Sequence, residues 1–354
     1  MDSYAALSRS WQAVSVRVLI LTLAVATAAA LAAGAGGTPT PRLEAPTPAD
    51  LAYSGPIRDS AVSTRTVQAS AFWGGTYTAS TGEPVMIFAS TAYPVDDAVA
   101  QRWAEFVASL VHGAELTRVR IYLVPPREIR GTCGFSALAC YDAAHAALYA
   151  PGQDNEGDPP AESIVAHEYG HHIAANRANN PWRAIDYGTK RWSTASHVCL
   201  RTESGVLSPG NETDSYRRNP GEGFAEAYRV LNERKLGRTE TPWDIVDQLL
   251  YPDEAALAAL EQDVLNPWAA AQILRYTGSG ASRTYTVATT LDGTVRATLR
   301  GKGTVAILRS TGTRLAGGRA TASATVCGLR TVRVRVTRPV SVAKTAFALT
   351  VTRP

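Results

Sequence analysis

The chain has 354 residues, of which 45% are hydrophobic and 19% charged, and its formal net charge is +4. This length allows one substantial hydrophobic core and a smaller companion domain. The weak positive charge, and the lack of a basic patch with interleaved aromatic residues, give no support to a nucleic-acid-binding protein.

Residues 1–35 have the pattern of a secretory signal peptide. A polar start with two arginines precedes an almost wholly apolar run over residues 18–33, and Ala33-Gly34-Ala35 offers a cleavage site of small residues. The protein is therefore expected to be secreted (extracellular), with a net charge of +3 once the signal is removed. The alternative is that residues 18–35 remain as a membrane anchor, because the apolar run is long for a signal peptide.

Residues 36–70 are rich in Pro, Thr and Ala and show no sustained apolar period. We interpret them as a linker or a short pro-segment. Organised sequence begins at Ala71, where the main folded domain is expected to start.

A β-hairpin, a helix and two strands are predicted in the first part of this domain. The hairpin spans residues 76–90 around a Thr-Gly turn. Asp96 opens the helix, in which apolar residues recur at helical spacing. The strands are expected over residues 118–124 and 146–150.

Four cysteines in an exported chain suggest two disulfides, for which three pairings are possible. Cys133 and Cys140 lie close in the sequence, and a bridge between them would stiffen a surface loop. That pairing leaves Cys199 and Cys327, whose bridge would tie the C-terminal region to the body. The alternative is that either pair is reduced and buried.

The segment AHEYGHHIA, residues 166–174, has the clearest chemical signal in the chain. His167 and His171 are four residues apart, so on a helix both imidazoles project from one face and can bind one metal ion. Glu168 is rotated by about 100° from His167, beside the metal rather than on it. This pattern is typical of zinc hydrolases, in which a carboxylate takes a proton from the zinc-bound water. The alternative is a solvated turn with a salt-bridged glutamate.

The helix that contains this motif is expected to begin at Asp158, whose side chain can cap it, with Pro159 and Pro160 in the first turn. His172 points about 100° away from His171 and is interpreted as a structural residue.

Catalytic zinc usually has three protein ligands, so a third is needed. The segment NPGEGFAEAYRVL, residues 219–231, is the best supplier, because Glu222 and Glu226 lie one helical turn apart and away from its apolar face. We expect Glu222 to bind zinc and Glu226 to accept a hydrogen bond from the free nitrogen of a histidine ligand. The alternatives are that Glu222 forms a capping box and that Asp214 is the third ligand.

A His-Glu-x-x-His helix followed by a helix reading Glu-x-Phe-Ala-Glu resembles the gluzincin metallopeptidases, in particular the branch with a lethal-factor-type second helix. The resemblance implies that His167, His171 and Glu222 bind one catalytic Zn²⁺ and that Glu168 is the general base. It also implies a zincin-like catalytic domain, with a twisted sheet and active-site helices, over residues 71–277.

Two further roles follow from this resemblance. In such enzymes an edge strand before the metal helix pairs with the extended substrate, which residues 146–150 would do here. Tyr216 resembles the tyrosine that precedes the ligand in that branch, and is expected to stabilise the oxyanion. His197 is the other candidate for this second role.

Towards the C-terminus the apolar period becomes two. Short helices are expected over residues 242–250, 253–264 and 267–275, followed by a linker at Gly278-Ser279-Gly280. Alternating runs between turns then predict a small all-β sandwich as an accessory domain over residues 278–354. It resembles the pre-peptidase C-terminal domains of secreted bacterial proteases, and its few acidic residues predict no calcium site.

These patterns predict an α+β protein with a zincin-like domain and a β-sandwich. The expected function is that of a secreted zinc metallopeptidase, an endopeptidase that acts on peptide or protein substrates. One alternative is a non-catalytic surface or partner-binding protein on a metallopeptidase scaffold. Another is a zinc hydrolase that acts on a substrate other than protein.

Overall fold

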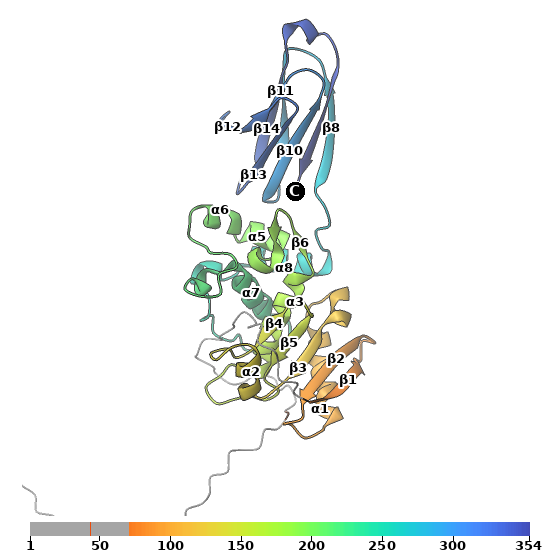
Figure 1. Ribbon diagram of the computed structural model, residues 1–354, viewed down its shortest axis with the longest axis vertical. Coiled ribbons are helices and arrows are strands. Elements are labelled where there is room, and N and C mark those ends of the chain that lie inside the picture. Colours follow the sequence, from red (N-terminus) through yellow and green to blue (C-terminus); the bar gives the residue numbers. More distant parts are fainter. Residues whose placement is uncertain (1–42, 44–70) are drawn as a thin grey trace, which may run out of the picture. The chain divides into compact units, whose positions relative to one another are not determined.

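The computed structural model describes residue 43 and residues 71–354, and has the α+β class that the sequence predicts (Figure 1). Helices and a five-stranded sheet form its N-terminal portion, and two four-stranded sheets form its C-terminal portion. The predicted signal peptide and, apart from Leu43, the predicted linker lie outside the described residues. Within the described residues, no helix is both long and apolar enough to cross a membrane.

The sheet of the N-terminal portion contains five strands. They are β1 (Phe72–Thr78), β2 (Pro84–Ser90), β3 (Arg120–Leu123), β4 (Cys140–Asp142) and β5 (Ala147–Ala150). Their order across the sheet is β1-β2-β3-β5-β4. β1 and β2 form the predicted antiparallel hairpin, β2, β3 and β5 run parallel, and β4 is antiparallel to β5.

The prediction that residues 146–150 form the edge of the sheet is wrong. β4 pairs with β5, so β4 is the edge strand on that side. The three residues of β4 are too short a run for their period to identify a strand in the sequence. β4 also begins at Cys140, which is bridged to Cys133 as expected. Both cysteines are buried in a small apolar cluster, so this bridge is covered rather than at the surface.

The helices of this portion all precede the C-terminal portion in the chain. They are α1 (Asp97–Ser109), η1 (Ala114–Arg118), α2 (Pro126–Thr132), α3 (Ala161–Ala175), α4 (Ala184–Tyr187), α5 (Lys190–Ala195), α6 (Val198–Glu203), η2 (Tyr216–Arg218), α7 (Pro220–Lys235), η3 (Gln248–Leu250) and α8 (Glu254–Leu265), with two short paired strands, β6 (Ala178–Asn179) and β7 (Trp182–Arg183). α1 is capped as predicted, because the Asp96 side chain accepts a hydrogen bond from the Val99 N–H at 3.1 Å.

Two predicted helices near the C-terminal portion are not formed as expected. Residues 242–250 contain only the short η3, and residues 267–275 contain no helix. The chain instead enters strand β8 (Gln272–Gly278), in which Leu274 and Tyr276 alternate towards an apolar core. Helix-forming alanines just before this strand concealed its period of two. Gly278 is therefore the last residue of β8, and Ser279 and Gly280 lie in the turn after it rather than in a linker.

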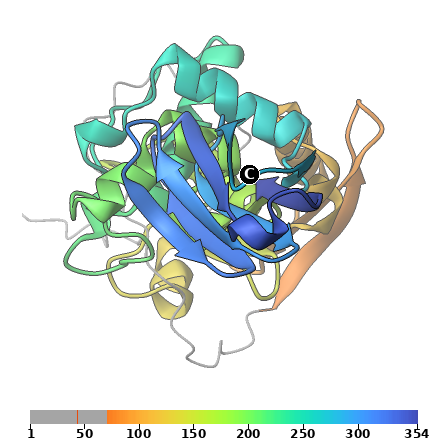
Figure 2. The ribbon, with the colours of Figure 1, turned by 90° about the horizontal axis from the view of Figure 1, so that it is seen from above.

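The C-terminal portion is a sandwich of two antiparallel sheets, coloured blue in Figures 1 and 2. Its further strands are β9 (Ser282–Ala288), β10 (Gly293–Arg300), β11 (Thr304–Arg309), β12 (Arg314–Gly318), β13 (Thr321–Val326), β14 (Thr331–Thr337) and β15 (Phe347–Arg353), and a short η4 (Val340–Val342) precedes β15. The sheet orders are β13-β10-β15-β8 and β12-β11-β14-β9. Valines such as Val295, Val334 and Val351 fill the space between them, because every second residue of each strand faces inward.

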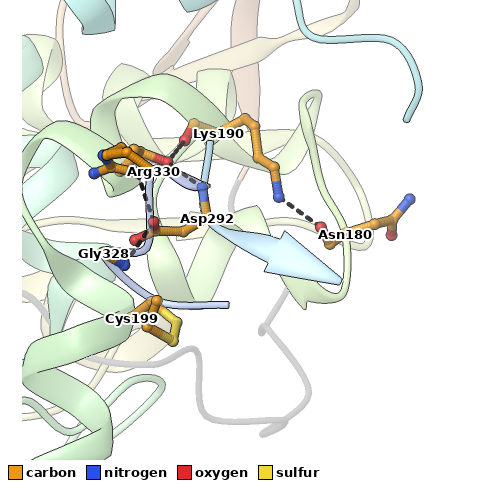
Figure 3. The surroundings of a disulfide bond; sticks show 8 residues. Asn180, Lys190, Cys199, Asp292, Gly328 and Arg330 are labelled. Carbon is orange, nitrogen blue, oxygen red and sulfur yellow. Dashed lines mark hydrogen bonds and ion pairs between the residues drawn. A yellow bond between two sulfur atoms is a disulfide. The ribbon is translucent and has the colours of Figure 1, made fainter. Parts of the chain in front are cut away.

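Covalent and polar contacts join the sandwich to the helices α5 and α6 (Figure 3). Cys199 at the start of α6 is bridged to Cys327, which confirms the second expected disulfide. The backbone N–H of Asp292 donates to the Thr194 hydroxyl at 3.0 Å. Because the disulfide joins residues 128 apart in sequence, it restrains the unfolded chain as well as the folded one.

Lys190 of α5 is buried at this junction. Its Nζ donates to the carbonyl of Asn180 at 2.6 Å and lies over the rings of Trp182 and Trp268, 5.3 and 4.9 Å from their centroids. Burial lowers the pKa of Lys190 to about 8, although the charges of Asp292 and Asp263 oppose that shift. The folded state therefore releases this proton more readily than the unfolded chain does.

The stability of the protein should consequently depend on pH through Lys190. Between about pH 8 and pH 10.5 the unfolded lysine holds more protons than the folded one, so rising pH favours folding. Relative to Lys190→Met, the free energy of unfolding of the wild type should rise across this window, by at most about 3 kcal/mol. Urea titrations of both proteins at several pH values measure this difference. A difference that stays constant from pH 8 to 10.5 would contradict it.

Candidate metal centre

The site is formed where helices α3 and α7 approach each other very closely. Gly170 of α3 permits this approach, because a Cβ at that position would lie 2.7 Å from Cα of Ala225 in α7. Any larger residue would push the helices apart. The glycine inside the histidine motif thus sets the distance between the two helices that bear the polar residues.

The start of α3 differs from the prediction. The helix begins at Ala161, and its first backbone N–H donates to the Asp154 side chain at 2.7 Å. Asp158 therefore does not cap this helix. The loop before the two prolines folds back, which brings a carboxylate from seven residues upstream to the helix N-terminus.

His167, His171 and Glu222 converge on one point. The Nε2 atom of His167 lies 3.4 Å from Oε2 of Glu222, and the Nε2 atom of His171 lies 3.3 Å from that same oxygen. Donors that bind zinc tetrahedrally at about 2.1 Å stand roughly 3.4 Å apart. The spacing of these three side chains therefore fits a single Zn²⁺ ion, and their donor types are those of known catalytic zinc sites.

A second grouping of potential ligands does not form a metal site. Cys199, Glu203 and Cys327 lie close together, but the two sulfur atoms are joined in a disulfide. A disulfide offers no thiolate to a metal ion.

Glu226 fixes the orientation of the His167 ring. Its Oε2 lies 2.9 Å from Nδ1 of His167, one turn after Glu222 on α7. Because Nδ1–H donates to this carboxylate, Nε2 is the nitrogen of His167 that faces Glu222 and would bind a cation. Burial raises the pKa of Glu226, but the charge of Arg229 and the hydrogen bonds that it receives lower that pKa to about 2. Glu226 is thus an anion at neutral pH.

Arg229 and Glu233 extend this arrangement along α7. Arg229 is fully buried and forms two hydrogen bonds with Glu226, from Nη2 at 2.6 Å and from Nε at 3.0 Å. Its Nη1 donates to Glu233, which also accepts hydrogen bonds from Ser163 and Thr241. Removal of one member would leave a buried charge without its counter-charge, at a cost of about 3–5 kcal/mol.

Arg229 and Glu233 are not among the residues expected from the sequence, although their spacing is visible in it. Residues 222, 226, 229 and 233 follow one another at spacings of four, three and four, so they lie along one side of the helix. Charged residues on a solvent-exposed face show the same spacing. Only the burial of all four in the structure distinguishes the two cases.

Tyr216 lies at the same site. It is the first residue of η2, and its hydroxyl donates a hydrogen bond to Oε2 of Glu222 at 2.9 Å. Asp214, the alternative ligand, is exposed and lies outside the group of three. The capping-box alternative for Glu222 is not formed, because the Asn219 N–H donates to the Tyr216 carbonyl instead. Asn219 itself caps α7 through its side chain.

The other histidines have structural roles or lie elsewhere. His172 is buried, with Nε2 donating to the Glu115 carbonyl at 3.0 Å and Nδ1 accepting from the Tyr141 hydroxyl at 2.9 Å. This agrees with the expectation that it points away from the metal ligands. His197 is exposed at the start of α6 and does not belong to the ligand group.

The electrostatics of the site favour a cation. Burial raises the pKa of Glu222, but the two histidines outweigh this effect and hold the pKa well below its usual value. Burial lowers the pKa of His167, yet its hydrogen bonds with Glu222 and Glu226 raise that pKa to about 9. Glu168, the next residue of α3, is also fully buried. A positive charge at the centre of this group therefore has strongly favourable surroundings.

Comparisons with known proteins give little information about this chain. No protein-family profile matches the sequence, and no curated protein matches it. Among solved structures, PliG of Aeromonas hydrophila, a periplasmic inhibitor of g-type lysozyme, is 12% identical with a TM-score of 0.20 and covers 24% of this chain and 86% of its own. The capsular polysaccharide assembling protein CapF of Staphylococcus aureus is 11% identical with a TM-score of 0.14, covering 78% of this chain and 75% of its own. Scores this low support no conclusion about fold or function.

Replacement of Glu222 by Ala should lower the affinity for zinc by about 100-fold or more, because two histidines alone leave the ion with too few protein ligands. Calorimetric titration of zinc into chelator-stripped protein measures the affinity. Asp214→Ala is the matched control, since it removes an exposed carboxylate outside the group, and it should bind zinc like the wild type. Wild-type affinity in Glu222→Ala would show that another residue is the ligand.

Glu226→Gln should weaken zinc binding by about 10–100-fold while leaving all three ligands in place, because the amide no longer fixes the His167 ring as an anion does. The same titration tests this effect. Glu261→Gln is the control, since it changes a partly exposed ion pair with Lys235. Equal zinc affinities for the two variants would exclude the orienting role of Glu226.

Proposed function

We propose that this chain is a zinc-dependent metallopeptidase that cleaves peptide bonds within proteins. The observation that supports this best is the position of Glu222 Oε2, which lies 3.4 and 3.3 Å from the Nε2 atoms of His167 and His171. One turn of α3 thus supplies both imidazoles, and the same turn supplies Glu168. Two histidines and a carboxylate around one point, with a further glutamate beside them, are typical of zinc-dependent peptide hydrolysis.

Each residue of the group then has a distinct role. Zinc, when bound, polarises a carbonyl and lowers the pKa of a water molecule. The carboxylate of Glu168 accepts the proton that the attacking water gives up, and returns it to the leaving amine. Its neighbour His167 is kept in one tautomer by Glu226, so the ligand set is oriented before substrate arrives.

Tyr216 is suited to stabilise the negative charge that develops on the carbonyl oxygen. Its hydroxyl is within hydrogen-bond distance of the ligand atom of Glu222, which places a donor at the edge of the ligand group. In the reaction this O–H donates to the oxyanion instead of to Glu222. Tyr216 leads His197 for this role, because His197 does not reach the group.

The substrate is proposed to bind as an extended peptide along β4. β4 is an edge strand, so one side of its backbone is not paired within the sheet. The Tyr141 hydroxyl of β4 donates to His172 of α3, which fixes the strand to the helix that bears the ligands. This edge takes the role that the sequence analysis gave to residues 146–150.

The proposed place of action is outside the cell, either free or anchored by residues 18–35. Both disulfides support an oxidising compartment, because such bonds persist mainly in exported proteins. All four cysteines of the chain are bridged.

Glu168→Gln tests the proposed mechanism directly. The variant should keep wild-type zinc affinity but lose proteolysis of casein by at least about 100-fold, because the amide cannot accept the proton. The wild type should also lose activity with a chelator. Glu203→Gln, an exposed glutamate of α6, should retain full activity.

Three outcomes would contradict the proposal. Unchanged proteolysis in Glu168→Gln would show that Glu168 is not the general base. Wild-type protein that binds zinc but never cleaves casein or other unfolded proteins would favour the non-catalytic binding protein or a hydrolase with a different substrate. Purified protein without stoichiometric zinc would exclude both the zinc peptidase and a zinc hydrolase that acts on another substrate.

A further inference from the structure

The two folded portions of the chain have strongly opposite charges. Residues 272–354 contain fourteen lysines and arginines and one acidic residue, Asp292, which gives a net charge of +13. Residues 71–271 contain sixteen basic and twenty-six acidic residues, a net charge of −10. The small charge of the whole chain hides this segregation, so it says nothing about the partners of the sandwich.

The positive charge of the sandwich lies at its surface. Twelve of its fourteen basic side chains are exposed, whereas Arg338 is buried and Arg353 is partly buried. Asp292 is 1% exposed and paired with Arg330 at 2.9 Å. No carboxylate side chain therefore interrupts the positive surface of residues 272–354.

Both outer faces of the sandwich display arginines among small polar residues. On the β13-β10-β15-β8 sheet, Arg296 lies between Ser323 and Thr352 on the neighbouring strands. On the other sheet, Arg333 and Arg335 of β14 project from the same face, about 7 Å apart along the strand. The register places Thr286 and Thr284 beside them on β9. Guanidinium groups spaced in this way can each bind an oxyanion with two hydrogen bonds.

We propose that the sandwich binds a flexible linear polyanion with closely spaced oxyanion groups, such as a phosphate polymer. Charge complementarity supports this partner, because the sandwich attracts it while the α/β portion repels it. The arginines occupy both faces, so a flexible chain can contact more of them at once than a flat bilayer can. The proposal is independent of the metal centre and of the proposed peptidase activity.

The aromatic residues of the sandwich argue against a nucleic acid as this polymer. Proteins that bind single strands stack the bases on exposed aromatic rings. Here Tyr276 and Tyr285 pack on each other between the sheets, with ring centroids 4.6 Å apart, and Phe347 is buried. The outer faces offer charge and hydroxyl groups but no stacking surface.

The test measures binding of the full chain to long-chain inorganic polyphosphate, in the presence of a chelator so that zinc has no part. Arg296→Gln, Arg333→Gln and Arg335→Gln are combined in one variant. Arg102→Gln, Arg127→Gln and Arg130→Gln form the matched control, since they remove the same charge from exposed positions of the α/β portion. The sandwich variant should bind at least about tenfold more weakly, and the control should stay within about twofold of the wild type.

Wild-type binding should also weaken steeply as salt is raised, because bound counterions are released from the polymer. Equal losses in the two variants would overturn the proposal, since net charge alone would then explain binding. Tighter binding to duplex DNA or to vesicles with 30% phosphatidylserine, at the same ionic strength, would also overturn it. Self-association of the chain through these arginines, seen by sedimentation at low salt, would assign the surface to a second copy instead.

Discussion

The close contact between α3 and α7 at Gly170 is the constraint on which the site depends. The glycine lets the backbone of α7 lie against α3. Glu222 of α7 therefore lies within 3.4 Å of His167 and His171 of α3, and no loop residue is needed to complete the group. Ligands on two packed helices need no ordering when the ion arrives, because their rotamers are already fixed by packing.

This close packing has an electrostatic cost that α7 itself offsets. Glu222, Glu226 and Glu233 are buried on one helix and would repel one another. Arg229 lies between Glu226 and Glu233 and pairs with both, which leaves Glu222 as the carboxylate available to a cation. The same helix therefore separates a structural ion pair from the candidate ligand by one turn. Its apolar side, with Phe224 and Tyr228, fixes it in the core.

The fold class, the hairpin and the Cys133–Cys140 bridge are predictable from local patterns, whereas the Cys199–Cys327 bridge follows only because these two cysteines remain. His167 and His171 are expected on one helix face because residues four apart in a helix project from the same side. Other features depend on contacts distant in sequence: the edge position of β4, the capping of α3 by Asp154, and strand β8 in place of a helix. A single sequence gives no measure of such contacts. The burial of Arg229, which makes it the counter-charge of Glu226 and Glu233, also depends on contacts between residues distant in sequence.

The segregation of charge is present in the sequence but concealed by its total, because −10 and +13 nearly cancel in the formal net charge of +4. The exposure of Arg296, Arg333 and Arg335, which alternate with buried apolar residues, shows that these arginines lie on the outer faces of the sandwich rather than between its sheets. The chain thus combines a buried, preorganised polar centre in one portion with a positively charged surface in the other. The two are separable by experiment, since neither depends on the other's chemistry.

The most direct test of the central claim is an anomalous difference map at the zinc absorption edge, from crystals of the wild-type protein grown with zinc. The account predicts one strong peak about 2.1 Å from the Nε2 atoms of His167 and His171 and from Oε2 of Glu222. A map without a peak there, or with the only strong peak bound by other residues, would contradict it.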